Sequence, residues 1–140
     1  MMLKLWCGVV AAVVLAGCAS VPPTPRTASK LECDGGRKCE VAVGVTCSVS
    51  GCQLSVEHDL VVVLEKKQVD IVWLLPTDSE YAFAQRGIEF KESRDFDCKA
   101  DGPRRFVCRD RHSKFGAWKY AISVTGPKQV PPLDPWVIND

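Results

Sequence analysis

The two histidines are the residues of this chain best suited to proton transfer near neutral pH. His58 stands directly before Asp59, and His112 lies in a basic stretch without a carboxylate at the spacing typical of hydrolases. Nucleophilic catalysis needs such a base within reach of an activated serine or cysteine, and no serine stands in a G-x-S-x-G turn. The two catalytic carboxylates of a glycosidase are recognised by the distance between them in space, which a sequence does not give. No single pair of acidic residues stands out in this chain. The pattern predicts a protein that is not an enzyme.

The start of the chain has the features of an export signal. One lysine, Lys4, precedes an apolar run from Leu5 to Leu15. A run of about 11 residues suits a signal peptide and is too short for a helix that crosses about 30 Å of hydrocarbon. The run ends in Leu15-Ala16-Gly17-Cys18. Over these first residues the chain resembles bacterial lipoproteins, whose lipobox places small residues directly before a cysteine.

This resemblance implies that residues 1–17 are removed, that a diacylglyceryl group is attached to the Cys18 sulfur, and that the new amine is acylated. Several acyl chains hold a protein stably on a membrane, at about 0.8 kcal/mol per buried CH₂. In such lipoproteins an aspartate after the lipidated cysteine commonly marks retention in the inner membrane. Ala19 and Ser20 follow Cys18 here. We therefore expect a lipid-anchored protein on the outer membrane, facing the periplasm.

The chain contains eight cysteines, of which Cys7 belongs to the leader and Cys18 to the lipid. An even set of six remains: Cys33, Cys39, Cys47, Cys52, Cys98 and Cys108. Such a set in an exported protein predicts disulfides, although six cysteines allow 15 pairings. Local spacing suggests Cys47 with Cys52 at a hairpin end, Cys98 with Cys108 across a turn, and Cys33 with Cys39 around Gly35-Gly36. Zinc sites favour closer pairs such as C-x₂-C, so no metal and no cofactor is predicted.

Apolar and polar residues alternate with period two along most of the chain after Cys39, which indicates half-buried strands. Strands are predicted over 39–47, 54–58, 60–64, 69–75, 81–83, 88–91, 106–108 and 118–125. The segment 60–64 is apolar on both faces, as in a central strand or a bend between two sheets. Gly, Pro and Asp turns separate the strands. We predict an all-β fold, a disulfide-stapled, Ig-like two-sheet sandwich of seven or eight strands, with a small closed barrel as the alternative.

Five short segments along the predicted strands and the C-terminal tail contain aromatic residues. They are Trp73-Leu74-Leu75-Pro76, Tyr81-Ala82-Phe83, Gly87-Ile88-Glu89-Phe90, Trp118-Lys119-Tyr120-Ala121-Ile122 and Leu133-Asp134-Pro135-Trp136-Val137. Over about residues 39–140 the chain is similar to small uncharacterised proteobacterial lipoproteins and secreted proteins. The similarity implies a sandwich, with Trp73 expected to fill its core as a central tryptophan does in Ig-like folds. It implies no catalytic residue.

Two segments are candidates for binding. The first is a basic stretch with Arg104, Arg105, Arg109, Arg111 and Lys114. On a hairpin Arg105 and Arg109 share one face, which is either a solvated surface that discourages edge pairing or a docking patch for an acidic protein or an anionic envelope polymer. The second is the tail, where Trp136, Val137 and Ile138 follow three prolines. Such residues are expected to fold back over a sheet edge, or else to bind a partner as an extended peptide.

The length and charge of the chain limit its organisation. Without the 17 leader residues, 123 of the 140 remain, enough for one core, with 17 basic and 17 acidic side chains. This balance argues against a nucleic-acid partner. The predicted organisation is a signal peptide over 1–17, a lipidated proline-rich tether over 18–31, a sandwich over 32–126 and an apolar tail over 127–140.

We expect a non-enzymatic binding or assembly module that is held on the outer membrane by its N-terminal lipid. The alternative is a periplasmic inhibitor or immunity protein that blocks a lytic enzyme. Such an inhibitor needs a protruding loop that enters an active-site cleft. By their polarity, the candidate loops are residues 77–80 and 100–105.

Overall fold

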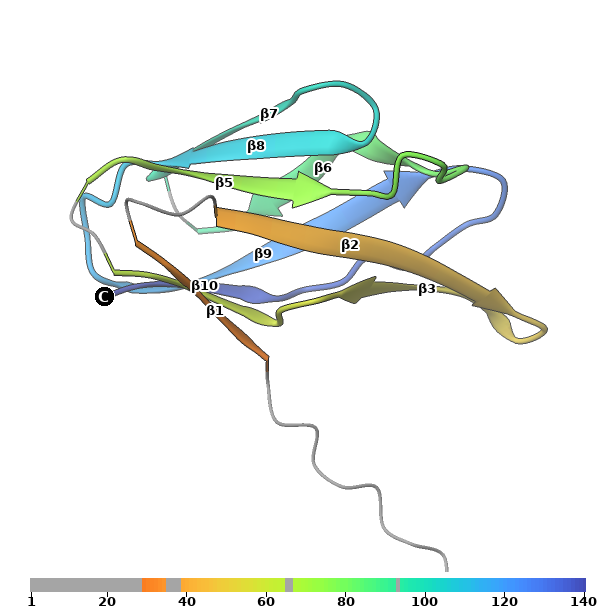
Figure 1. Cartoon of the computed structure of the whole chain (residues 1–140), viewed down its shortest axis with the longest axis horizontal. Helices are drawn as coiled ribbons and strands as arrows, with labels where there is room; N and C mark the ends of the chain where they lie inside the picture. The colour runs from red at the N-terminus through yellow and green to blue at the C-terminus, as the bar shows by residue number, and fades with distance from the viewer. Residues whose placement is uncertain (1–28, 35–38, 65–66, 93) are drawn as a thin grey trace, which may run out of the picture.

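The computed structural model describes residues 29–34, 39–64, 67–92 and 94–140. The predicted leader, Cys18, residues 19–28 of the tether and Gly35-Gly36 lie outside the described residues. The strands form two facing layers (Figure 1). Sheet A has the strand order β1-β4-β10-β9-β6, and sheet B has the order β3-β2-β5-β8-β7. The predicted two-sheet sandwich is confirmed, and the sheets do not close into a barrel.

Each sheet contains five strands. Sheet A consists of β1 (Lys30–Cys33), β4 (Leu60–Val63), β10 (Trp136–Asn139), β9 (Gly116–Thr125) and β6 (Ala82–Phe90). Sheet B consists of β3 (Gly51–Val56), β2 (Cys39–Ser48), β5 (Val69–Leu74), β8 (Arg105–Asp110) and β7 (Phe96–Ala100). In the described part of the chain, no helix is long and apolar enough to cross a membrane.

The described residues form more strands than the seven or eight predicted. Strands β1, β7 and β10 were not foreseen, because each has only four or five residues. The segments 81–83 and 88–91 belong to one strand, β6, whose pairing with β9 is interrupted between Phe83 and Ile88. Strand β4 pairs in parallel with both β1 and β10, and β2 pairs in parallel with β5. The sheets are therefore mixed, whereas the sheets of an immunoglobulin sandwich are antiparallel.

Trp73 fills the centre of the core, as predicted. It lies on β5, the middle strand of sheet B, and has no exposed surface. Its Nε1 donates a hydrogen bond of 3.1 Å to the hydroxyl of Tyr120, which lies on β9 in the opposite sheet and is equally buried. The rings of Trp73 and Tyr120 meet edge to face with centroids 5.1 Å apart. This contact joins the two layers because a buried indole N–H needs an acceptor.

Three disulfides link the six cysteines in the pairing that local spacing suggested. Cys47–Cys52 joins β2 to β3, and Cys98–Cys108 joins β7 to β8, in both cases between directly opposed residues. Cys33–Cys39 joins β1 of sheet A to β2 of sheet B. Loops this short contribute about 2–3 kcal/mol each in the chain-entropy model.

The predicted boundaries of the sandwich at residues 32 and 126 are wrong. Strand β1 begins at Lys30, inside the predicted tether. Strand β10 lies inside sheet A between β4 and β9, where Val137 is fully buried. The tail folds back, as predicted, but it fills the interior of the sheet rather than covering an edge. The hydrogen bonds and core contacts that it completes make it part of the domain.

Candidate functional site

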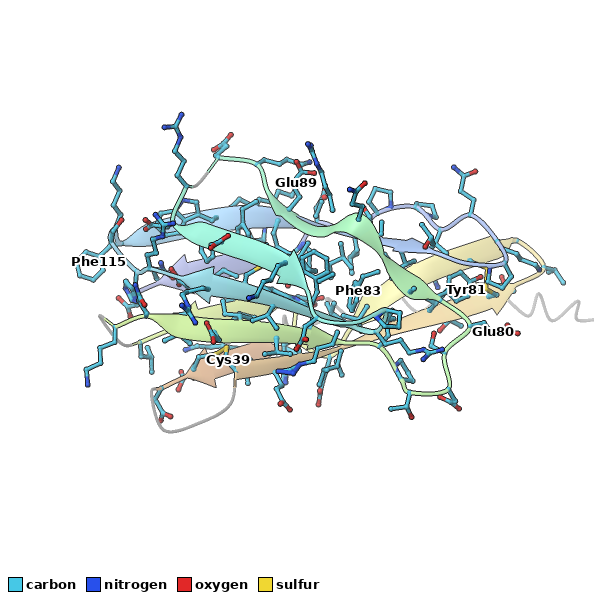
Figure 2. All side chains as sticks on the ribbon, turned by 90° about the horizontal axis from the view of Figure 1, so that it is seen from above. Cys39, Glu80, Tyr81, Phe83, Glu89 and Phe115 are labelled. Carbon is cyan, nitrogen blue, oxygen red and sulfur yellow. A yellow bond between two sulfur atoms is a disulfide. The ribbon has the colours of Figure 1, made fainter. Side chains whose placement is uncertain are left out.

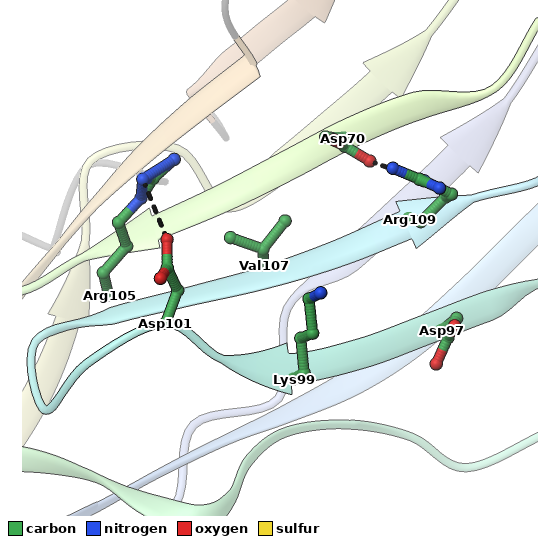
Figure 3. Close-up of a pocket in the computed structure, with 7 residues that line it drawn as sticks. All are labelled: Asp70, Asp97, Lys99, Asp101, Arg105, Val107 and Arg109. Carbon is green, nitrogen blue, oxygen red and sulfur yellow. Dashed lines mark hydrogen bonds and ion pairs between the residues drawn. The ribbon is translucent and has the colours of Figure 1, made fainter.

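The outer surface of sheet B carries a charged face, which we define by the residues that line its groove: Asp70, Asp97, Lys99, Asp101, Arg105, Val107 and Arg109 (Figure 3). The register of the sheet brings these residues together. Arg109 on β8 lies opposite Asp70 on β5 and Asp97 on β7. Because side chains alternate along a strand, Arg105, Val107 and Arg109 all point away from the core. The groove has a volume of about 310 Å³.

Ion pairs arrange the charges on this face. The Nε of Arg109 lies 3.1 Å from Oδ1 of Asp70, and the Nη1 of Arg105 lies 3.1 Å from Oδ2 of Asp101. Figure 3 shows these two pairs on either side of Val107. All four charged side chains are about half exposed, so each pair contributes at most about 1 kcal/mol to stability. The two ion pairs therefore contribute little to the stability of the fold.

The strands under the charged face are held rigidly. Phe106 and Cys108 alternate with the outer residues of β8 and are buried in the core. Cys108 is bonded to Cys98 on β7. A packed inner layer and a covalent cross-link fix the spacing of the strands that carry the outer side chains.

The predicted basic patch does not form as a single surface. Arg105 and Arg109 share one face, as predicted, but both are paired with aspartates. Arg104 is partly buried, and its Nε donates to the carbonyl oxygen of Ser79. Arg111 and Lys114 are exposed in the connection that follows β8. The cations are dispersed because Arg104 lies in the turn before β8, Arg105 and Arg109 lie on the strand, and Arg111 and Lys114 follow it. Asp101 in the turn and Asp70 on the neighbouring strand β5 pair with the two strand arginines.

The two polar loops proposed for an inhibitor lie side by side. The Nε of Arg104 donates a 3.0 Å hydrogen bond to the Ser79 carbonyl, and the N–H of Leu75 donates a 2.9 Å bond to the Arg104 carbonyl. The N–H of Phe83 donates a 2.8 Å bond to the Pro103 carbonyl. We call residues 76–81 and 101–104 together the loop end. Figure 2 shows Glu80 and Tyr81 of this loop end at the opposite end of the domain from Phe115.

A second groove, of about 360 Å³, runs beside the loop end. Its lining includes Asp78, Glu80, Tyr81 and Cys47. The Tyr81 hydroxyl lies 3.5 Å from the Cys47 sulfur and 3.6 Å from the Cys52 sulfur. The Tyr81 ring also lies against Gly126, where an added Cβ would come within 2.4 Å of it. These contacts brace the loop end against β2, β3 and the end of β9.

His58 has a partner that the sequence order concealed. Its Nδ1 lies 2.9 Å from the Oγ of Ser29, and its Nε2 lies 3.9 Å from a carboxylate oxygen of Glu57. The second distance is too long for a hydrogen bond, so Glu57 does not orient the ring as the third member of a triad does. Ser29 and Glu57 are exposed. This arrangement lacks the enclosed, oriented geometry that nucleophilic catalysis uses.

A cluster of buried polar residues lies where β8 and β10 end. Oδ1 of Asp110 accepts hydrogen bonds from the His112 N–H at 2.8 Å and from Nδ2 of Asn139 at 3.2 Å. Oδ2 of Asp110, Oδ1 of Asn139 and both ring nitrogens of His112 have no hydrogen-bond partner among the described residues. Burial raises the pKa of the Asp110 carboxyl, although these hydrogen bonds act to lower it. His112 also has a left-handed backbone, with φ of 48°, which is uncommon outside glycine.

Trp136, the remaining predicted binding residue, lies on the outer surface of sheet A with 44% of its surface exposed. It is therefore on the opposite side of the sandwich from the charged face. Among the described residues, no three His, Cys, Asp or Glu side chains gather so that they could hold a metal ion. Comparison of the chain with protein-family models and with curated proteins finds no match.

Sequence reasoning missed three features of the site. The pairing of Asp70 with Arg109 and the contact of His58 with Ser29 join segments that are distant in the sequence. Asp110 follows Phe106 and Cys108 at a spacing of two, so strand alternation would have pointed it into the core. A charged side chain is rarely buried, however, so the alternation alone did not place Asp110 in the core.

Proposed function

We propose that this protein is a non-enzymatic binding module, anchored to the outer membrane by a lipid at Cys18, and that its charged face holds an envelope protein. The observation that carries the proposal is the groove of about 310 Å³ lined by both signs of charge on a cross-linked hairpin. Such a surface is preformed, and it selects a partner by the position of its charges.

The charge pattern favours a protein over an anionic polymer as the partner. Asp70, Asp97 and Asp101 stand among Lys99, Arg105 and Arg109. A polyanion would meet these three carboxylates together with the cations, and like charges brought together disfavour binding. A protein surface can place an acid opposite each cation and a base opposite each carboxylate.

The inhibitor hypothesis is the second candidate, and the loop end supports it. Two loops from different parts of the chain are joined by the bond from Arg104 to Ser79 and braced by Tyr81. A rigid polar projection is suited to filling an active-site cleft because little entropy is lost when it binds.

Anchoring is tested by replacing Cys18 with alanine. We expect the variant to keep its leader or to appear in the soluble fraction, because a single leader run cannot span the bilayer. Intact-mass measurement of the parent should show the acyl groups on Cys18 and the loss of residues 1–17. A parent chain without acyl groups would contradict the anchor.

The charged face is tested by exchanging the charges of one pair, D101R/R105D, which keeps both the ion pair and the net charge. We expect partner recovery after crosslinking in the native envelope to fall about tenfold, equivalent to about 1.4 kcal/mol. Stability should change by less than about 1 kcal/mol, because the pair is exposed. Quantitative mass spectrometry of the crosslinked partners measures the effect.

The matched control is R86E/E89R, which exchanges another exposed pair on β6 of sheet A and should leave partner recovery unchanged. A D78K/E80K variant tests the loop end in the same way. If a lytic enzyme is lost from the crosslinked partners of D78K/E80K but is still recovered with D101R/R105D, the result would favour the inhibitor hypothesis. Full recovery of every partner with D101R/R105D would refute the role of the charged face.

A further inference from the structure

The outer surface of sheet A carries an apolar stripe that spans two neighbouring strands, β4 and β10. The register forms two rows, Lys30–Leu60–Trp136–Lys119 and Glu32–Val62–Ile138–Ala117. We call Leu60, Val62, Trp136 and Ile138 the apolar stripe. Their neighbours along the strands, such as Val61 and Val137, are fully buried in the core, so the stripe faces outward.

The residues around the stripe have the chemistry of a membrane interface. Lys30 and Lys119 stand at the two ends of the first row, and the Nζ of Lys119 lies 6.0 Å from the Trp136 ring centre. Tryptophan prefers the boundary between hydrocarbon and headgroups, and lysine places its ammonium among the headgroups above it. Trp136 is 44% exposed, so its ring is available for such contact.

The position of the tether brings this surface to the bilayer. Strand β1 is an edge strand of sheet A (Figure 1). Its first residue, Lys30, belongs to the same row as Trp136. Only 11 residues separate Cys18 from Lys30, so the fully extended chain reaches about 40 Å. A lipid on Cys18 therefore keeps sheet A within reach of the membrane at all times.

A second copy of the chain fits the apolar stripe less well than a lipid bilayer does. Trp136 contributes most of the exposed apolar surface, Leu60 and Ile138 are half-buried, and Val62 is only 6% exposed. The stripe therefore offers far less than the roughly 800 Å² that a stable interface needs from each partner. The nearby carboxylates are already paired, Glu32 with Lys30 and Asp134 with Lys119. The bilayer needs no larger matching surface, since the acyl anchor supplies most of the binding.

We propose that the apolar stripe lies on the lipid bilayer, so that the charged face of sheet B points away from the membrane toward the partner. This inference rests on the lipid anchor of the proposed function. Trp136 then inserts at the level of the headgroups, and Lys30 and Lys119 lie against the phosphates. The bilayer contact thereby fixes which face of the domain is turned away from the membrane.

The test uses the full mature protein, with its native N-terminal modification, in phosphatidylcholine vesicles that contain a bromine-labelled lipid. Bromine quenches the emission of tryptophan that touches the acyl chains. The emission of Trp136 is the part of the tryptophan emission that W136F removes. We expect the bromine-labelled lipid to quench this part, and vesicles without the label to leave it unchanged. The matched control W136F/V107W places the tryptophan on the charged face, where the emission should remain unquenched.

The outcomes separate the anchor from the orientation. Protein that fails to float with the vesicles overturns the anchor, and the inference falls with it. Protein that floats but shows equal emission with and without the bromine label overturns the inference alone. Equal quenching of Trp136 and of V107W also overturns it, because the domain then has no fixed orientation.

Discussion

Replacement of Trp73 by alanine is expected to lower the free energy of unfolding by about 3–5 kcal/mol. The side chain is fully buried at the centre of sheet B and contacts the rings of Tyr120 and Phe90. Its removal leaves a cavity and deprives the Tyr120 hydroxyl of its hydrogen bond. A domain of this size has only about 5–15 kcal/mol of stability in total, so the variant should be close to unfolding. Urea denaturation at neutral pH, with the disulfides intact, measures the change.

Two milder variants separate packing from hydrogen bonding. W73F keeps an aromatic ring in the core but cannot donate to Tyr120. Y120F keeps the ring of Tyr120 but removes the acceptor. Each variant should lower the free energy of unfolding by less than W73A does. The double variant should lower it by less than the sum of the two single effects, because both remove the same hydrogen bond. A W73A variant within about 1 kcal/mol of the parent would mean that Trp73 is not the centre of the core.

The second large effect concerns the dependence of stability on pH. Burial raises the pKa of Asp110 in the folded state above its ordinary value of 3.8. Below pH 3.8 the carboxyl is protonated in both the folded and the unfolded chain. As the pH rises, the unfolded chain loses this proton first, which favours unfolding. The contribution of Asp110 to stability therefore falls from about pH 4 up to the folded pKa and is constant above it.

The D110N variant should remove this loss of stability. Its Oδ1 can still accept from the His112 N–H and from Asn139, as in the parent. Its amide is neutral across this pH range, so the variant never has to bury the carboxylate charge that the parent carries above its folded pKa. We therefore expect D110N to be more stable than the parent at pH 7 and equal to it near pH 3. Thermal unfolding across this pH range measures the difference.

D110A and D70N are the controls for this prediction. D110A leaves the donors of His112 and Asn139 without their acceptor, so it should be less stable than D110N. D70N changes an exposed aspartate of the charged face and should alter stability by about 0.5 kcal/mol or less. Comparing D110N with the parent across the pH range isolates the contribution of the Asp110 carboxyl. Parallel stability curves for the two chains would refute a raised pKa at Asp110.

The sequence foretold the parts of the fold that depend on local pattern. Alternation located β2, β5 and β9, and short spacings paired all six cysteines, because each bond closes a local loop. Strand β10 was taken for a tail, since its place between β4 and β9 depends on partners far away in the chain. The pairing of Arg109 with Asp70 was hidden for the same reason. A cluster of cations therefore resembled a basic patch until the neighbouring strands supplied its carboxylates.

The disulfide between Cys33 and Cys39 has a mechanical consequence. Tension applied through the N-terminus enters the domain along β1, which lies parallel to β4. When a force acts along a strand, the hydrogen bonds to its neighbour share the load. When a strand is peeled from one end, these bonds break one after another. Beyond Cys33 the load passes through the sulfur bridge directly into β2. The N-terminal edge strand of the domain is thus joined covalently to the opposite sheet, at the point where such a force would enter.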